Sequence, residues 1–145
     1  MWVAKIKING ENALIGSRAK KFKVSISGYP VSSYEKRNGF YIYLVGFLYG
    51  KEPNKKRFII DLKKDKRVVN LEVKGDFIIG QIKEPLKFKP FYNHRIIHLE
   101  PVTIKEDGFE FWTVGSWDKK ELINFINLVK RTHEGKLLRI KQEKI

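Results

Sequence analysis

The stretch G-F-Y-I-Y-L-V-G at residues 39–46 occurs a second time, as G-F-E-F-W-T-V-G at residues 108–115. The second copy begins 69 residues after the first, and four of the eight positions are identical. A Pro-Val pair precedes each copy, and a charged amphipathic stretch and a short apolar run follow each. A repeated pattern constrains the fold more than a single motif does, so the sequence predicts two related units.

The residues around the first copy predict a β-α-β-β-α-β unit over residues 1–74. Alternating or continuous apolar runs predict its strands, and three- and four-residue apolar spacing predicts its helices. In chain order these elements fall at residues 2–8, 13–22, 24–34, 40–49, 53–64 and 68–73. Asn38-Gly39 predicts the central hairpin. Pro30 is expected to interrupt the second strand, which resumes at residues 31–34 at an edge or a bulge. The order is ferredoxin-like, an antiparallel sheet with two helices on one face.

Residues 75–145 predict a degenerate second unit of the same kind. Pro85 and Pro90 prevent a normal helix where the first one is required, so a short turn or loop is expected there. A later helix is predicted from an apolar face, with Ser116 or Asp118 as its N-cap. Its strands are expected at residues 77–83, 96–104 with a break at Pro101, 109–115 and 137–140. The predicted fold class is therefore α+β, with tandem ferredoxin-like units in one compact module.

The chain has 30 Lys and Arg residues against 16 Asp and Glu residues, a formal net charge of +14. Such an excess is typical of a surface that binds nucleic acid or another polyanion. A lysine-rich thermophile surface is the alternative interpretation. The candidate polyanion contacts lie in and beside the two helices of the first unit: Arg18, Lys20, Lys21, Lys55, Lys56, Lys63 and Lys64.

Composition also limits the compartment and the chemistry. Cysteine is absent, which excludes disulfides, thiolate metal sites and a cysteine nucleophile. No apolar run approaches the ~20 residues that span a bilayer, and the start lacks the pattern of a secretory signal. These features predict a cytoplasmic protein without a membrane partner.

No assembled catalytic motif is found. His94 and His98 are four residues apart, but a strand would separate them by about 13 Å, so no metal site is predicted. The sequence contains no nucleophile elbow and no phosphate-binding glycine loop. We therefore expect a non-enzymatic protein without a cofactor.

Aromatic residues are the remaining candidates for binding. Tyr41 and Tyr43 follow a basic residue and a glycine, as in the third strand of an RNA-recognition domain, although core packing is the alternative interpretation. The repeat gives Glu110 and Trp112 the equivalent positions, so all four are expected on one sheet face. The candidate effector or interface residues are Tyr41, Tyr43, His94, His98, Trp112 and Trp117.

The second half resembles a known family. R-I-I-H-L-E-P-V-T-I-K-E-D-G at residues 95–108, the following F-E-F-W-T-V-G-S-W, and G-K-L-L-R-I-K-Q-E-K-I at residues 135–145 look like the N-terminal domain of archaeal helix-turn-helix regulators, similar to the bacterio-opsin activator group. In that family the N-terminal part is thought to sense or to assemble, and a C-terminal helix-turn-helix reads DNA. No such helix pair is found in residues 1–145.

The resemblance therefore implies a non-catalytic regulatory domain of an archaeal transcription regulator. Its implied work is to bind a small-molecule effector or to form a homodimer, and DNA would be contacted only through an attached helix-turn-helix domain. The alternative is a nucleic-acid-binding protein that uses a basic face of a ferredoxin-like fold. The effector cannot be identified from the sequence.

Overall fold

The computed structural model describes residues 1–144, so Ile145, the last residue of the predicted second unit, lies outside the described residues. It has the predicted α+β class, with an antiparallel sheet and helices packed against it. The strands are β1 Trp2–Asn9, β2 Ser25–Lys36, β3 Gly39–Tyr49, β4 Val68–Lys74, β5 Phe77–Glu84, β6 Ile97–His98, β7 Val102–Ile104, β8 Phe109–Ser116 and β9 Lys136–Gln142. The helices are α1 Leu14–Phe22, α2 Glu52–Lys63, the 3-10 helix η1 Leu86–Tyr92, and α3 Lys119–His133.

Within residues 1–144, all nine strands belong to one sheet. Eight of them follow the order β4-β5-β3-β2-β7-β8-β1-β9, and β6 pairs separately with β8. Every pairing is antiparallel. The first strand of the chain lies between β8 and β9, and β5 lies between β3 and β4. One sheet therefore joins strands from before and after residue 75.

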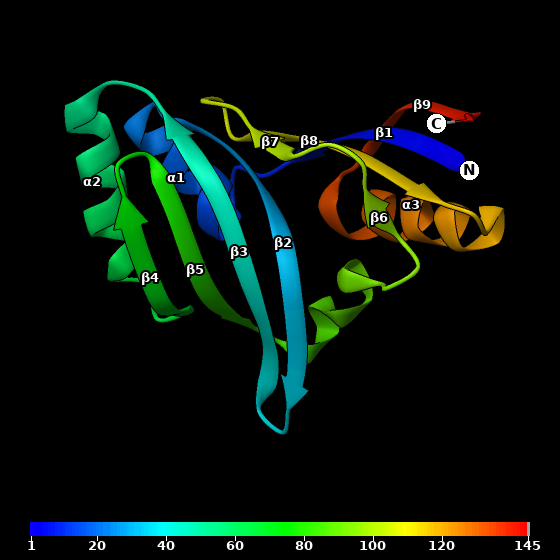
Figure 1. Cartoon of the computed structure of the whole chain (residues 1–145), viewed down its shortest axis with the longest axis horizontal. Helices are drawn as coiled ribbons and strands as arrows, with labels where there is room; N and C mark the ends of the chain where they lie inside the picture. The colour runs from blue at the N-terminus through cyan, green and yellow to red at the C-terminus, as the bar shows by residue number, and fades with distance from the viewer. Residues whose placement is uncertain (145) are drawn as a thin grey trace.

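The sheet has two arms, each with its own core. Figure 1 shows β2, β3, β4 and β5 running together on one side, while β1, β8 and β9 run in another direction near the termini. Helices α1 and α2 cover one face of the first arm, and Phe58 and Ile42 are fully buried there. Helix α3 covers the second arm, where Val114 and Leu122 are fully buried. Burial of these apolar faces stabilises each arm.

Strand β2 confirms the edge or bulge predicted after Pro30, but Pro30 does not interrupt the strand as expected. The strand continues through Pro30 to Lys36, and its pairing with β3 shifts by one residue between Pro30 and Ser32. Strand β7 pairs with β2 only up to Gly28, so beyond that point β2 has β3 as its one partner. Proline is tolerated at such a bulge on a free edge because no ladder donor is required there.

The two helical predictions for the second half are confirmed. Residues 86–92 form a 3-10 helix with Pro90 inside it, in place of an α-helix. Asp118 is the N-cap of α3, where its side chain accepts hydrogen bonds from the backbone N–H groups of Lys120 and Glu121. Ser116 supports the cap by accepting from the N–H group of Asp118. No helix in the described part of the chain is long and apolar enough to cross a membrane.

Candidate ligand-binding cavity

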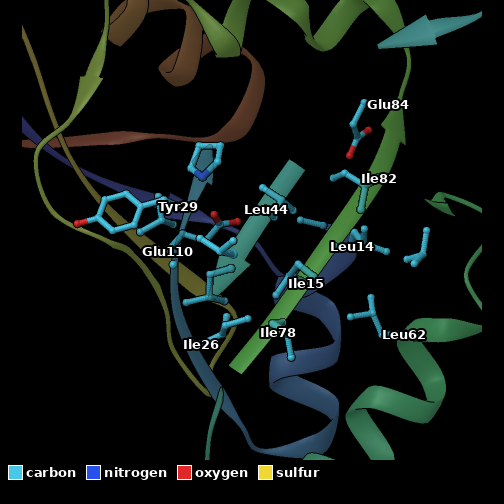
Figure 2. Close-up of a pocket in the computed structure, with 18 of the residues that line it drawn as sticks. Leu14, Ile15, Ile26, Tyr29, Leu44, Leu62, Ile78, Ile82, Glu84 and Glu110 are labelled. Atoms are coloured by element: carbon cyan, nitrogen blue, oxygen red, sulfur yellow. The ribbon is translucent and has the colours of Figure 1, made fainter. Parts of the chain in front are cut away.

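A partly enclosed cavity of about 210 Å³ lies where the two arms meet. Its walls come from the start of α1, the end of α2 and strands β2, β3, β4 and β5 on one side, and from η1, β6, β7 and β8 on the other. Figure 2 shows Leu14 and Ile15 of α1 facing Ile78 and Ile82 of β5 across this region. Helix η1 is short because Pro85 and Pro90 prevent a regular α-helix. Phe91 and Tyr92 of this helix line the cavity.

The wall is mainly aliphatic and aromatic, with a few polar groups. Among the described residues, the titratable or aromatic polar side chains in the wall are Tyr29, Glu84, Tyr92, His98, Glu110 and Trp112. Its volume exceeds that of engineered cavities of ~150 Å³ that bind benzene. An apolar hollow with a few convergent polar groups is the usual form of a small-molecule site.

Glu110 is a partly buried acidic group in the wall. Trp112 Nε1 donates a hydrogen bond to Glu110 Oε1 at 3.2 Å. Gly10 packs against the carboxyl group, since a Cβ atom added there would lie 2.6 Å from Glu110 Oε2. Burial raises the pKa of the Glu110 carboxyl, and the Trp112 hydrogen bond lowers it only in part. The side chain keeps some accessible surface because it lines the cavity.

Three further titratable groups share this environment. Burial raises the pKa of the Glu84 carboxyl, and the nearby positive charge of Arg67 opposes that shift. Burial also raises the pKa of the Tyr92 phenol, and the charges of Glu84 and Glu110 raise it further. Burial lowers the pKa of His98, which favours a neutral imidazole. Tyr92 therefore responds to both carboxyl groups, which lie at separate places in Figure 2.

His98 carries an unsatisfied polar atom. Its Nδ1 is buried and has no hydrogen-bond partner among residues 1–144. The imidazole ring lies edge-on to Trp112, with the ring centroids 5.7 Å apart. A buried polar atom without a partner carries a free-energy cost and is uncommon in folded proteins. His98 and Trp112, both predicted candidates, are thus brought together beside Glu110.

Tyr41 and Tyr43 lie on the other face of the sheet. Phe40, Ile42 and Leu48 of β3 point to the core under the helices, so the alternate tyrosines point outward. The tyrosines stand beside Tyr34, whose ring stacks on Tyr41 with centroids 5.0 Å apart. The expectation that Tyr41, Tyr43, Glu110 and Trp112 share one face is wrong. In β3, Phe40 and Ile42 pack under the helices, whereas in β8 Trp112 and Val114 do so. The repeat aligns Tyr41 with Glu110 and Tyr43 with Trp112, so the aligned residues lie on opposite faces relative to the helices.

The other two aromatic candidates lie away from the cavity. His94 is exposed in the turn after η1. Trp117 is 77% exposed near the termini, beside Met1 and Gln142. Neither residue lines the cavity beside Glu110.

The predicted basic contacts divide into paired and exposed groups. Arg18 binds Asp61 and Asp65 at 2.9 and 3.0 Å and joins α1 to the end of α2. Lys55 is buried and pairs with Glu52 and Asp76. Arg18 and Lys55 are therefore engaged in the fold. Lys20 binds Glu11 at the surface, Lys21 lies near the Phe22 ring, and Lys56, Lys63 and Lys64 are exposed.

Sequence reasoning did not select Glu84, Tyr92 or Glu110. Glu110 was interpreted as a partner of the exposed tyrosines because of its repeat position. One sequence signal did indicate that Glu110 faces the interior, because strand alternation places it on the same side of β8 as Trp112 and Val114. Tyr92 lies just after Pro85 and Pro90, in a segment where the sequence predicts neither a strand nor a helix. The direction of its side chain could therefore not be predicted.

Within the described residues, no group of three or more His, Asp or Glu side chains is arranged to hold a metal ion. No protein-family model matches the chain, and no curated protein matches it. The resemblance to archaeal regulators therefore stays a prediction.

Proposed function

We propose that this chain is a non-catalytic regulatory domain that senses a small-molecule effector. The cavity between the two arms is the observation that carries the proposal. Its apolar wall favours binding of an apolar body, and its few polar side chains can fix the orientation of that body. The buried Nδ1 of His98 and the enclosed Glu110 carboxyl are groups that a polar part of the effector would satisfy.

We further propose that the fold is a pair of ferredoxin-like units that have exchanged their first strands. The orders β4-β5-β3-β2 and β9-β1-β8-β7 are both obtained when β1 and β5 change places between two such units. The effector cavity is then formed at the joint between the units. A ligand bound there contacts both arms, so it can favour one relative orientation of the arms over others.

The regulatory context rests on the sequence resemblance. We propose an archaeal, cytoplasmic transcription regulator in which an attached helix-turn-helix domain reads DNA and this domain forms a homodimer. The uncovered face of the first arm supports the dimer proposal, because Phe47 and Tyr49 are 51% and 56% exposed on it. Analytical ultracentrifugation tests this part. A concentration-dependent dimer is expected, and a monomer at every concentration would contradict it.

Thermal unfolding with a neutral probe tests the effector-sensing proposal. tert-Butylbenzene should raise Tm in a concentration-dependent way, because a ligand that binds only the folded state stabilises it. Gly80→Val provides a blocked variant, since Gly80 lines the cavity and an added Cβ meets no atom closer than 3.4 Å.

Ser32→Val is the matched control, because Ser32 is an exposed position of β2 outside the cavity wall. We expect the probe to raise Tm of the wild type and of Ser32→Val, but not of Gly80→Val. An equal response of all three proteins would place binding elsewhere, and no response of any of them would contradict the proposal.

The second candidate function is binding of single-stranded nucleic acid on the outer face of the first arm. The observation in its favour is the stacked pair Tyr34–Tyr41, with Lys36 Nζ and Lys83 Nζ 5.8 and 5.9 Å from the Tyr41 ring centroid. Aromatic side chains beside cations are the usual platform for unpaired bases.

Fluorescence anisotropy with a labelled oligonucleotide tests this candidate. Binding should weaken steeply as salt increases and should weaken on Tyr41→Ala. Trp117→Ala is the control for loss of an exposed aromatic side chain distant from this face. Absence of binding at low salt would remove the candidate.

A further inference from the structure

We propose that the effector is a small hydrophobic cation, recognised in the cavity by the carboxylate of Glu110. This inference rests on the proposed sensing function and assigns the chemical class of its ligand. Its basis is the contrast between the cavity and the rest of the molecule. Although the chain carries a formal charge of +14, Glu84 and Glu110 line the cavity, and no Lys or Arg side chain within residues 1–144 lines it.

Of the two carboxyl groups, Glu110 is the one without a positive partner. The nearby charge of Arg67 favours ionisation of Glu84. Glu110 has a single hydrogen bond, from the neutral indole of Trp112, and no ion pair among the described residues. An enclosed carboxylate without a counter-charge is unfavourable, and a bound cation would remove that penalty.

The walls also suit a cation with an apolar body. Tyr29, Tyr92 and Trp112 contribute aromatic rings, which attract cations through their faces. Ile78, Leu44 and the other aliphatic side chains favour a hydrocarbon or aryl body. An anion would meet two carboxyl groups and no Lys or Arg side chain in the described wall, so the cavity should reject it.

The titratable groups that face Glu110 set the direction of its pH dependence. They are Tyr29 of β2, Glu84 of β5, Tyr92 of η1 and His98 of β6. The wall residues of α1, α2, β3, β4 and β7 carry no acidic or basic side chain. Raising the pH ionises the two carboxyl groups and keeps His98 neutral, and both changes favour a cation. Affinity for a permanent cation should therefore rise with pH, and binding should release a proton where Glu110 is still protonated.

Isothermal titration calorimetry with three probes tests the inference. Phenyltrimethylammonium is a permanent cation, tert-butylbenzene is its neutral isostere, and 3-phenylpropionate is an anion of similar size. We expect the cation to bind about tenfold or more tightly than the neutral probe, and the anion to bind most weakly. Titration of the cation at mildly acidic pH in buffers of different ionisation enthalpy should reveal proton release.

Glu110→Gln removes the charge and keeps the shape of the side chain. We expect this variant to lose the preference for the cation and the proton release, while the affinity for tert-butylbenzene changes less than about twofold. Glu106→Gln, an exposed change in the turn before β8, should behave like the wild type. A cation preference that survives Glu110→Gln would overturn the assignment.

The probe series separates failure of the inference from failure of the proposed function. If the neutral probe binds and the cation shows no advantage, the cavity is a ligand site but its ligand is not a cation. If no probe binds, both proposals fail. Should Glu110→Gln not fold, the wild-type ranking of the three probes and its change with pH still decide the inference.

Discussion

At the residue scale, the buried acid Glu110 makes the free protein less stable than it could be. Burial raises the pKa of its carboxyl group, so the folded state holds its proton more tightly than the unfolded chain does. Folding stability then decreases as pH rises through the interval between the unfolded and the folded pKa. If Glu110 binds the proposed effector, function and stability conflict at this position, as is common at binding sites.

Glu110→Gln should consequently stabilise the ligand-free protein. We expect a gain of about 0.5–2 kcal/mol in the free energy of unfolding at neutral pH, and a smaller gain near pH 4, where the unfolded carboxyl group is also largely protonated. Urea denaturation at both pH values measures the gain. A loss of stability at neutral pH would show that the carboxylate is already compensated in the free protein.

Asp65 shows the opposite behaviour. It accepts hydrogen bonds from Arg18 and from the side chain and backbone N–H of Arg67. These bonds hold the pKa of its carboxyl well below the usual range. Its contribution is present above the unfolded pKa of ~4 and is lost as pH falls through the folded pKa.

Asp65→Asn should therefore destabilise the protein by about 1–2 kcal/mol at neutral pH, after allowance for solvent screening. The difference from the wild type should diminish as the pH is lowered, because protonation then removes the same charge from the wild type. Denaturation curves from pH 7 to pH 2 test this, with the exposed Asp107→Asn as control. A constant difference at all pH values would contradict the assignment.

At the element scale, local sequence signals predicted the helices and strands well. Asp118, followed by an apolar helical face, predicted the start of α3. Pro85 and Pro90 predicted that no regular α-helix forms at η1. The edge or bulge predicted after Pro30 was confirmed, because the pairing of β2 with β3 shifts by one residue there and β7 pairs with β2 only up to Gly28. The predicted interruption was wrong, since a proline on a free edge removes no ladder hydrogen bond.

The cap of α3 can be tested directly. Asp118 satisfies two N–H groups that have no partner within the helix. Asp118→Ala should lower the free energy of unfolding by about 1 kcal/mol, while Glu106→Ala in an exposed turn should have little effect. Chemical denaturation followed by circular dichroism measures both. Equal stability of the two variants would mean that the cap contributes little.

At the scale of the whole molecule, the pairing of β1 with β8 and β9, and of β5 with β3 and β4, could not be predicted. Chain order predicts that residues 1–74 and 75–145 each form their own unit, and that the two units share one extended sheet or pack through their open faces. The structure instead pairs Trp2–Asn9 with the strands on both sides of α3, and Phe77–Glu84 with β3 and β4. Glu110 lines the same cavity as residues of β3 and β5, so strands of both arms form the candidate cavity.

The shared sheet predicts that the two arms unfold together. Scanning calorimetry should give one transition with equal calorimetric and van't Hoff enthalpies. Separate fragments 1–74 and 75–145 should each remain largely unfolded, because each lacks the strand that the other supplies. Two resolved transitions, or a fragment that folds alone, would contradict the coupling of the arms.

The most direct measurement of the central claim follows the tryptophan indole N–H signals in a ¹H–¹⁵N NMR spectrum. The chain has three tryptophans, and Trp112 alone among them lines the cavity, where its Nε1 donates to Glu110. Addition of phenyltrimethylammonium should shift the Trp112 signal in a saturable way and leave the exposed Trp117 signal unchanged. A Trp112 signal that stays fixed while the probe is bound, or that moves no more than the Trp117 signal, would contradict a ligand site in the cavity.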